Sequence, residues 1–256
     1  MRVHKEVLPV ITFFTTCPSI GMTQRNAIES WGHIDPAGDL IIFGSHDDVM
    51  NLARQGWIAA PVDMVHGRPR VDEMFRLADE MSEQEFCCYV NTDIILTTAF
   101  MDAVEYVAEA FDYFMITGQR WDVKVGVDVT SLEESELTAF LDLRPSLRLH
   151  PTSGMDYFCW RGPIWDAGIP AYAVAAYAWD TDLMCIALES GHPVVDITPF
   201  HKAYHQDHKL GTRRDCPAAE YNLELLKHGR DDWHWRLRGT QHATHVLYPD
   251  GEIIEK

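Results

Sequence analysis

The chain has 256 residues, of which 46% are hydrophobic and 23% are charged, a composition typical of a globular protein rather than a disordered one. Its formal net charge of −18 argues against nonspecific nucleic-acid binding, because phosphate contacts need clustered Lys and Arg. No run approaches the roughly 18 apolar residues of a membrane span. The polar N-terminus predicts no signal peptide, and six cysteines without metal-type CxxC spacing predict a reducing, cytoplasmic location.

Strands and helices are expected to alternate through the first 118 residues. Apolar runs rich in β-formers predict strands, and apolar residues at helical spacing predict helices. The expected strands cover residues 8–16, 39–44, 59–62, 86–90 and 113–117. The expected helices cover residues 23–31, 49–55, 72–83 and 98–111, with an acidic turn at 45–48. This rhythm predicts an α/β fold with a mostly parallel, Rossmann-like central sheet that has helices on both faces.

The pattern changes after Gly118. The expected elements are a surface helix over 131–141, a strand over 156–162, a helix over 179–190 that ends at Gly191, a strand over 193–197, a helix over 219–227 and a hairpin at 248–251. No repeat or low-complexity linker divides the chain. We therefore expect one domain over residues 1–256.

Acidic residues and histidines follow several of the expected strands. Asp93 comes just after the buried strand 86–90, and ligands of α/β proteins bind where the strands end. A divalent cation and a diphosphate can meet at such a carboxylate, although an Asp that caps the next helix is the alternative. The sequence has no GxGxxG, GxxxxGK[ST] or GxSxG motif, which argues against a dinucleotide oxidoreductase, a P-loop NTPase and a hydrolase.

Three groups of residues, in this order, resemble the motifs of the GT-A nucleotide-sugar glycosyltransferases, in particular their family 2-like inverting members. Residues 90–96, Val-Asn-Thr-Asp-Ile-Ile-Leu, resemble the DxD-type motif. Residues 179–183, Trp-Asp-Thr-Asp-Leu, resemble the later acidic helix. Residues 205–208, His-Gln-Asp-His, follow where many of these enzymes place a metal-binding histidine. The resemblance covers residues 7–210.

The resemblance implies a single GT-A-like domain that moves a sugar from a nucleotide-diphosphate donor to an acceptor hydroxyl. Residues 1–118 would form the nucleotide-sugar-binding half, 119–210 the acceptor and catalytic half, and 211–256 a C-terminal extension. Departure of the diphosphate needs charge stabilisation, commonly from Mn²⁺ or Mg²⁺. Asp93 and His205 are the implied metal ligands. Asn91 stands where the DxD-type motif usually has its first acid, so we expect weak metal binding.

Site residues also follow from the resemblance. Asp180 would be the base that takes the proton of the acceptor hydroxyl, in a single displacement that inverts the anomeric carbon, and Asp156 is the rival base. The expected donor-binding residues are Thr15, Thr16, Arg25, Asp47, Asp72, Asn91, Thr92 and Asp93. The expected acceptor-binding residues are Arg120, Trp121, Asp122, Tyr157, Trp160 and Trp179.

Purely structural roles compete with several of these assignments. Asp72 and Asp180 would also serve as helix N-caps, and Asp47 as part of a charged turn. A sugar- or nucleotide-binding module without catalysis is a competing function, favoured by Asn91. A sugar-nucleotide nucleotidyltransferase is another, although the chain lacks its Gly-rich signature. The acceptor is left open between a glycan, a lipid-linked sugar, a protein and a modified nucleobase.

Overall fold

The computed structural model describes residues 9–54, 57–207, 216–228, 231 and 233–256. The first half contains β1 Ile11–Thr16, α1 Met22–Ile34, β2 Asp39–Gly44, α2 His46–Arg54, β3 Ala59–Pro61, β4 Met64–Val65, β5 Arg68–Pro69, α3 Val71–Met81, β6 Phe86–Val90, β7 Ile94–Ile95, α4 Thr98–Ala110 and β8 Phe114–Thr117. The second half contains β9 Arg120–Val123, α5 Glu134–Asp142, β10 Arg148–Leu149, β11 Tyr157–Arg161, α6 Trp179–Glu189, β12 Val194–Asp196, β13 Ala203–Gln206, α7 Pro217–Lys227, the 3₁₀ helices Trp233–Arg236 and Thr240–His242, β14 His245–Leu247 and β15 Ile253–Glu255.

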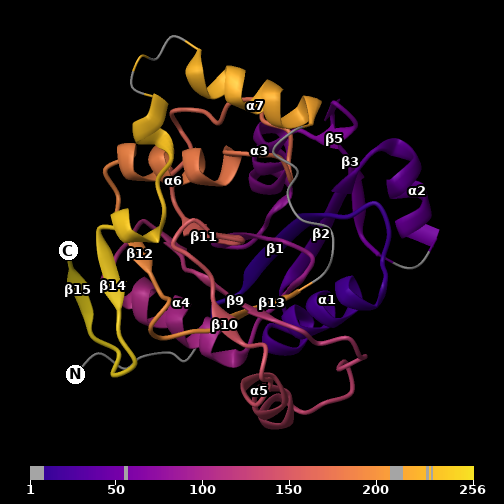
Figure 1. The fold of residues 1–256 in the computed structure, drawn as a ribbon, viewed down its shortest axis with the longest axis vertical. Helices are drawn as coiled ribbons and strands as arrows, with labels where there is room; N and C mark the ends of the chain where they lie inside the picture. Colours follow the sequence, from indigo (N-terminus) through magenta and orange to yellow (C-terminus); the bar gives the residue numbers. More distant parts are fainter. Residues whose placement is uncertain (1–8, 55–56, 208–215, 229–230, 232) are drawn as a thin grey trace.

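A nine-stranded sheet runs through the centre of the molecule (Figure 1). Its strands lie in the order β15-β14-β12-β8-β11-β6-β1-β2-β3. The neighbours β3, β2, β1 and β6 are parallel, and so are β8, β12 and β14. β11 lies antiparallel between β6 and β8, and β15 is antiparallel at one edge. The predicted α/β fold with a mostly parallel central sheet is therefore confirmed.

Successive side chains of each strand point to opposite faces, which gives this sheet two apolar cores. On β1, Phe13 belongs to one core and Phe14 to the other. Helices α1 and α4 cover the first face, where the rings of Trp31 and Phe100 pack 6.0 and 6.3 Å from that of Phe13. Helices α3 and α6 cover the second face, where Phe75 packs 5.0 Å from Phe14. Figure 1 shows these two helix layers on either side of the sheet.

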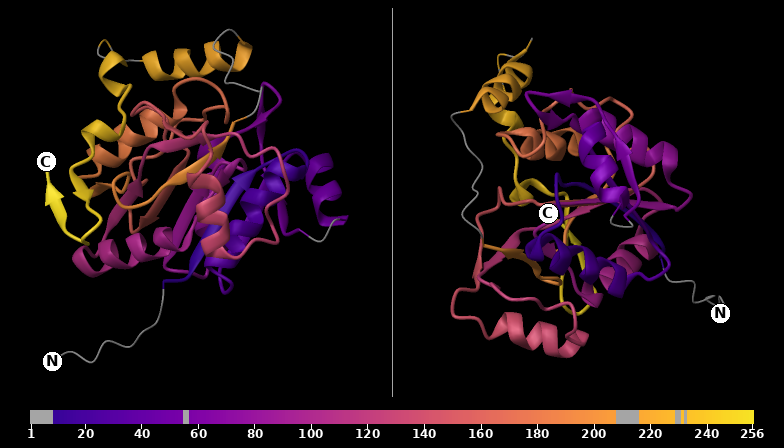
Figure 2. Two further views of the ribbon diagram at one scale, coloured as in Figure 1. Left: turned by 60° about the horizontal axis from the view of Figure 1, so that its bottom comes forward. Right: turned by 90° about the vertical axis from the view of Figure 1, so that its right-hand side faces the viewer.

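A second sheet of four short strands, in the order β10-β9-β13-β7, was not predicted. Strands β7, β9 and β13 come directly after β6, β8 and β12 along the chain, so this small sheet lies where the parallel strands end. Leu137 and Leu141 of α5 pack against its outer face, on Val123 and Tyr204. Figure 2 shows α5 standing away from the main sheet on this side. The small sheet therefore borders the edge where ligands of α/β proteins bind.

The C-terminal segment packs onto the rest of the domain. Asn222 of α7 donates to the carbonyls of Ala173 and Tyr177 at 2.9 and 3.1 Å and accepts from the Ala173 N–H at 2.8 Å. β14 pairs with β12 and widens the main sheet. None of the helices formed by the described residues is long and apolar enough to cross a membrane.

Most predicted elements are found, and the strands 39–44 and 86–90 have their predicted bounds. The prediction of an acidic turn at 45–48 is wrong, because α2 already begins at His46. Ser45 caps this helix: its hydroxyl donates to the Asp48 carboxylate at 2.7 Å and accepts from the Asp48 N–H at 3.3 Å. The predicted start of the first strand at Leu8 and the end of the second helix at Gln55 lie outside the described residues.

Candidate active site

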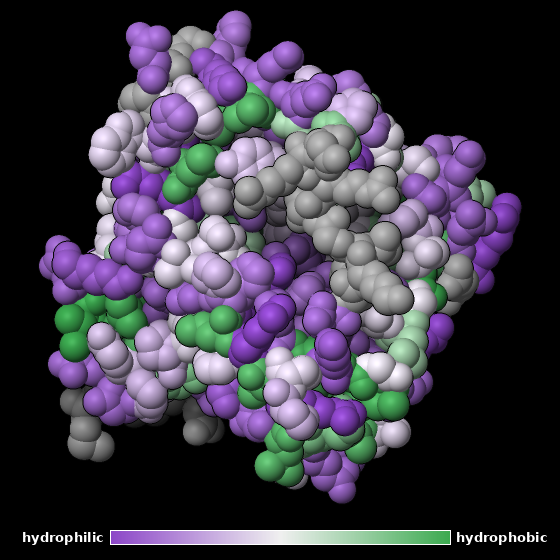
Figure 3. Space-filling model, in the orientation of Figure 1, coloured by the Kyte–Doolittle hydropathy of each residue, from purple (hydrophilic) through white to green (hydrophobic). Residues whose placement is uncertain are grey.

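Polar side chains from four segments of the chain meet where the strands of the main sheet end. Residues 91–93 form the turn between β6 and β7, Arg120 and Asp122 belong to β9, Asp156 precedes β11, and His205 belongs to β13. Figure 3 shows that the centre of this face of the molecule is hydrophilic, whereas hydrophobic residues show at the bottom, near α5. We call these side chains the polar cluster.

A histidine links two carboxylates in this cluster. The Nε2 atom of His205 lies 3.3 Å from Asp93 Oδ2, and its Nδ1 atom lies 3.1 Å from Asp122 Oδ1. Burial lowers the pKa of His205, but the hydrogen bond and charge of Asp93 raise it, so that the net pKa lies above its ordinary value. The imidazolium form is therefore more favoured here than in a histidine exposed to water.

Arg120 extends the chain of charge pairs to Asp156. Its Nη1 atom lies 2.6 Å from Asp156 Oδ2 and its Nε atom 3.0 Å from Asp122 Oδ1. The side-chain amide of Asn91 donates to the other oxygen of Asp156 at 2.8 Å. Because both oxygens of Asp156 already accept strong hydrogen bonds, this carboxylate is poorly suited to take a proton from an incoming hydroxyl.

The contacts of Asn91 explain why an amide fits this position better than a carboxylate. Its oxygen accepts from the Tyr89 hydroxyl at 2.7 Å while its nitrogen donates to Asp156. A carboxylate at this position has no proton to donate and would repel Asp156. The local structure therefore favours Asn91 where the resembling motif has an acid.

Asp180 lies in the first turn of α6 and is partly buried. The Thr181 N–H donates to it at 2.9 Å. Burial raises the pKa of Asp180, and the charge of Asp156 raises it further, to about 7. The pKa of Tyr89 is raised by burial first and then by the charges of Asp156, Asp93 and Asp180, so that the three carboxylates all act on this one side chain.

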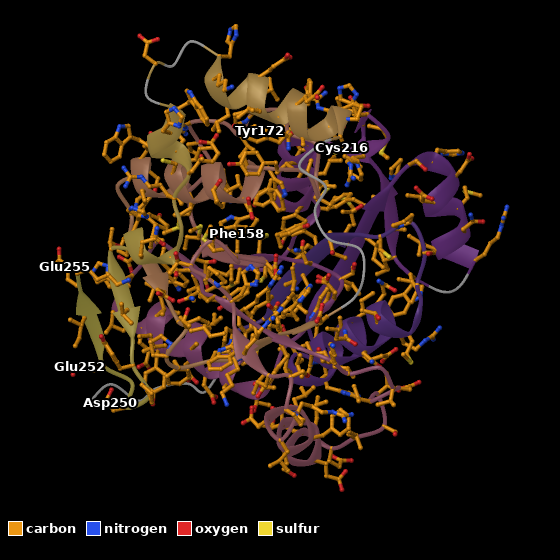
Figure 4. The ribbon with its side chains drawn as sticks, in the orientation of Figure 1. Phe158, Tyr172, Cys216, Asp250, Glu252 and Glu255 are labelled. Carbon is orange, nitrogen blue, oxygen red and sulfur yellow. The ribbon has the colours of Figure 1, made fainter. Side chains whose placement is uncertain are left out.

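Asp182, two residues further along α6, is completely buried and pairs with Arg236 of the C-terminal segment. Arg236 also donates to Glu189 at 2.6 Å, and the Tyr172 hydroxyl donates to Asp182 at 2.7 Å. Figure 4 labels Tyr172 between α6 and α7. This pair fixes the helix turn that carries Asp180. Arg236 was not predicted from the sequence, where its only signal is a single Arg in the aromatic segment 233–236.

Two further partners of Asp122 were also missed. His150 Nδ1 and Arg148 Nε lie 2.9 and 3.4 Å from Asp122 Oδ2. Burial raises the pKa of Asp122, but the hydrogen bond from His150 and the charge of Arg120 lower it, and the net pKa lies below the ordinary value. A strand as short as β10 leaves no recognisable pattern in the sequence, so no local signal pointed to these residues.

The ends of β1 and β6 meet beside the cluster. The Cys17 thiol, just past β1, donates to the Ser19 carbonyl at 2.6 Å, and burial raises its pKa while the nearby Thr92 side chain lowers it. Thr16 is partly buried at this point, whereas Thr15 is fully buried and its hydroxyl has no hydrogen-bond partner among the described residues. Thr16 and Thr92 therefore stay in the candidate donor site, and Thr15 is too deeply buried to reach a ligand.

Four other expected residues lie outside the cluster. Arg25 and Asp47 are exposed on α1 and α2. Asp72 forms an ion pair with Arg70 at 2.6 Å, in a different cavity. Trp121 contributes to the core of the small sheet rather than to the cluster. The structure does not join these four side chains to Asp93.

The expected acceptor platform of aromatic residues is corrected to a packing role. Tyr157, Trp160 and Trp179 are 0%, 3% and 4% exposed. The Trp160 ring stacks on Phe75 at a centroid distance of 5.2 Å, and the Trp179 ring meets that of Tyr89 at 5.3 Å in a T-shaped contact. Their apolar area stabilises the sheet–helix core and is not open to an acceptor.

Asp93 and His205 fit a divalent cation as a pair. No group of three or more His, Cys, Asp or Glu side chains in the described part of the chain could hold a metal ion. His205 Nε2 and Asp93 Oδ2 are 3.3 Å apart. An octahedral cation with ligands at about 2.1 Å places neighbouring ligand atoms about 3 Å from each other, which is close to this distance. Asp122 binds Nδ1 and so orients Nε2, which must release its proton to the solvent before a metal binds. Diphosphate oxygens and water would supply the other ligands.

The arrangement defines a GT-A-like α/β fold, and a comparison with solved structures agrees. The chain resembles mannosyltransferase PcManGT from Pyrobaculum calidifontis, solved in complex with GDP-Man and Mn²⁺, with a TM-score of 0.50 and 9% identity over 90% of this chain and 72% of that one. At this identity the likeness shows the fold alone.

Two further structures are similar at lower scores. S. aureus TarS 1-349 matches 85% of this chain with a TM-score of 0.45 and 13% identity, and the bifunctional IspDF from Campylobacter jejuni matches 74% with a TM-score of 0.41 and 10% identity. This chain spans 63% and 49% of their respective lengths. No family model and no curated protein matches the sequence.

We expect Asn91→Asp to lower the free energy of unfolding by about 1–3 kcal/mol at pH 8, because a second carboxylate would face Asp156. The repulsion raises the folded-state pKa of the new carboxyl group, so the loss should shrink as the pH falls toward 4. Urea unfolding at both pH values measures this, with Asn51→Asp on the exposed side of α2 as a control. A loss of equal size at both pH values would contradict the like-charge explanation.

We expect Arg236→Met to cost about 3–5 kcal/mol of unfolding free energy, because it leaves the buried Asp182 without its cation. The double variant Arg236→Met/Asp182→Asn should recover much of this loss. Arg238→Met, a less buried neighbour, is the matched control. A double variant as unstable as the single one would show that charge pairing is not the cause.

Proposed function

We propose that this protein is a glycosyltransferase that moves a sugar from a nucleotide-diphosphate donor to an acceptor hydroxyl by a single inverting displacement. The observation that carries the proposal is the set of three carboxylates around Tyr89, where Asp93 faces His205 and Asp180 has a pKa of about 7. A base with this pKa is half deprotonated at neutral pH and still strong enough to accept a proton. The GT-A-like fold supports the same class of reaction.

The two halves of the domain take different substrates in this proposal. Residues 1–118 bind the donor, with Thr16, Thr92 and Asp93 nearest to it. Residues 119–210 bind the acceptor and carry Asp180. The extension 211–256 supports α6 through its buried arginine. The acceptor is any molecule with a suitably placed hydroxyl, such as a glycan, a lipid-linked sugar, a protein or a modified nucleobase.

In the proposed mechanism, Asp93 and His205 would hold Mn²⁺ or Mg²⁺, which when bound neutralises charge on the departing diphosphate. Asp180 accepts the proton of the acceptor hydroxyl while the hydroxyl oxygen forms a bond to the anomeric carbon. The bond between that carbon and the diphosphate oxygen breaks on the opposite side, so the configuration inverts. The electron pair leaves with the diphosphate, and Asp180 releases its proton to the solvent afterwards.

Donor turnover tests this proposal directly. The protein is incubated with a panel of UDP-, GDP- and dTDP-sugars, with and without Mn²⁺, and free nucleoside diphosphate is measured. We expect slow hydrolysis of one donor that depends on Mn²⁺ and is lost in Asp93→Asn. Failure to bind or hydrolyse any of these donors in both conditions would refute the proposal.

Donor binding without turnover would instead support a catalytically silent binding module. The observation that favours this second candidate is that the side chains of the polar cluster already bond to one another. Asn91 is engaged with Tyr89 and Asp156, and Asp93 already faces the His205 imidazole at 3.3 Å. Calorimetry with the same nucleotides measures binding, which both functions predict. Release of free nucleoside diphosphate is expected only of the enzyme, so the two measurements together separate the two functions.

We expect kcat/KM for transfer to rise about tenfold per pH unit up to a pH of about 7 and then to level off, because Asp180 acts only when deprotonated. Asp180→Asn should lower kcat about 10²- to 10⁴-fold and remove this pH limb while donor binding persists. Asp102→Asn, exposed on α4, is the control. An Asp180→Asn variant with normal transfer would exclude Asp180 as the base.

A further inference from the structure

Two alanines in the segment before α6 have a left-handed backbone conformation. Ala175 has a φ of 53°, and Ala178, the N-cap of α6, has a φ of 76°. Such angles are unfavourable for alanine, because its Cβ atom comes too close to a neighbouring carbonyl oxygen. Residues stay in this region only where the surrounding structure holds them, and they cluster at functional sites. The candidate base Asp180 follows two residues after Ala178.

Helix α7 holds one side of this segment and lies next to α6 (Figure 1). Its Asn222 is completely buried and makes three hydrogen bonds to the backbone of the segment. The side chain accepts from the Ala173 N–H at 2.8 Å and donates to the Ala173 and Tyr177 carbonyls at 2.9 and 3.1 Å. Ala218 of α7 packs in one small apolar cluster with Ala173 and Ala176. The carboxamide supplies both the acceptor and the two donors that these backbone groups need.

The hairpin of β4 and β5 holds the other side. Nη1 of Arg68 donates to the carbonyls of Val174 and Ala175 at 3.3 and 2.9 Å. The Val174 N–H donates to the Pro69 carbonyl at 3.0 Å. Arg68 therefore bonds one of the two left-handed residues directly, and Asn222 bonds the carbonyl just before the other.

The conformation of Ala178 sets where α6 begins. Its carbonyl accepts from the Asp182 N–H and from the Thr181 hydroxyl, both at 3.1 Å. The Thr181 N–H in turn donates to the Asp180 carboxylate at 2.9 Å. The position of this carboxylate therefore depends on the turn that Ala178 starts.

We propose that Asn222 is a positioning residue for Asp180: together with Arg68, it holds segment 173–178 in a strained conformation that fixes the first turn of α6. The inference rests on the proposed role of Asp180 as the base. It gives α7, in the C-terminal extension, a part in arranging the reaction centre.

Titration of the Asp180 carboxyl carbon in the ¹³C-labelled full chain tests this without any substrate, and Asp180→Asn identifies the signal. Burial and the charge of Asp156 raise the pKa of Asp180 to about 7, against the opposing charge of Arg120. We expect Asn222→Ala to lower this pKa by about one pH unit or more, because a released turn exposes the carboxylate to water. Glu224→Ala, on the exposed side of α7, is the matched control and should leave the pKa unchanged.

Arg68→Met releases the segment from its other side, and it takes the place of Asn222→Ala if that variant does not fold. We expect it to lower the pKa of Asp180 as well, and Arg68→Lys, which keeps a donor, to restore part of the shift. Loss of a cation alone would raise the pKa of a carboxyl group, so charge cannot explain a fall. A folded Asn222→Ala or Arg68→Met protein in which Asp180 still titrates at about 7 would overturn the inference.

Ala178→Gly tests the strain separately. Glycine adopts a positive φ without steric cost, so we expect this variant to have a Tm at least as high as that of the unchanged protein. Ala53→Gly, exposed on α2, is the control and should lower the Tm, as glycine does within a helix. An equal fall of the Tm in both variants would contradict the strained conformation.

Transfer assays separate this inference from the proposed function. With an active donor, Asn222→Ala should lower kcat and move the pH limb to lower pH while donor binding is unchanged. If no donor is bound or turned over, the proposed function fails, and the carboxyl titration still decides whether Asn222 positions Asp180.

Discussion

The candidate site depends on a single buried carboxylate, Asp122, which is only 4% exposed. It is matched by Arg120, Arg148, His150 and His205, all within 3.4 Å. A buried carboxylate that loses such partners costs several kcal/mol, so the pairing must form whenever the domain folds. Since the partners come from β9, from β10 and the residue after it, and from β13, the same pairing fixes the small sheet against the ends of the main strands. The positions of His205 and Arg120 follow from it.

This arrangement also decides how the site can meet an anionic substrate. Arg120 is shared between Asp122 and Asp156, and His205 lies between Asp93 and the same Asp122. These cations are therefore already neutralised, in a chain whose net charge is −18. A diphosphate that enters the site needs positive charge from elsewhere, and a divalent ion that arrives with it is the most direct source. In the proposed reaction, Asp93 and His205 would be the two protein ligands of such an ion, and the diphosphate would supply further oxygens.

The sequence predicted the parts of the fold that local patterns encode. Strand 86–90 and Asp93 after it were found from an apolar run and a turn, and α6 with Asp180 from helical spacing and a capping glycine. The small sheet was missed because its strands are two to four residues long and its pairing is non-local. The bond between Asp122 and His205 joins residues 83 apart. Arg236 was missed for the same reason, since only the folded chain brings it to Asp182.

Asp156 and Asp180 show how environment gives one residue type two roles. Asp156 is held by a guanidinium and an amide, which favours its ionised form and occupies its oxygens. Asp180 accepts a hydrogen bond from a backbone N–H, and burial raises its pKa to about 7, so it keeps a proton until near neutral pH. The charge of Asp156 already raises the pKa of Asp180. A further acid at position 91 would add negative charge to the same group of side chains and keep Asp180 protonated at neutral pH. The neutral amide of Asn91 thus avoids added negative charge in the cluster, and it leaves Asp180 able to lose its proton near neutral pH, as the proposed role of a base requires.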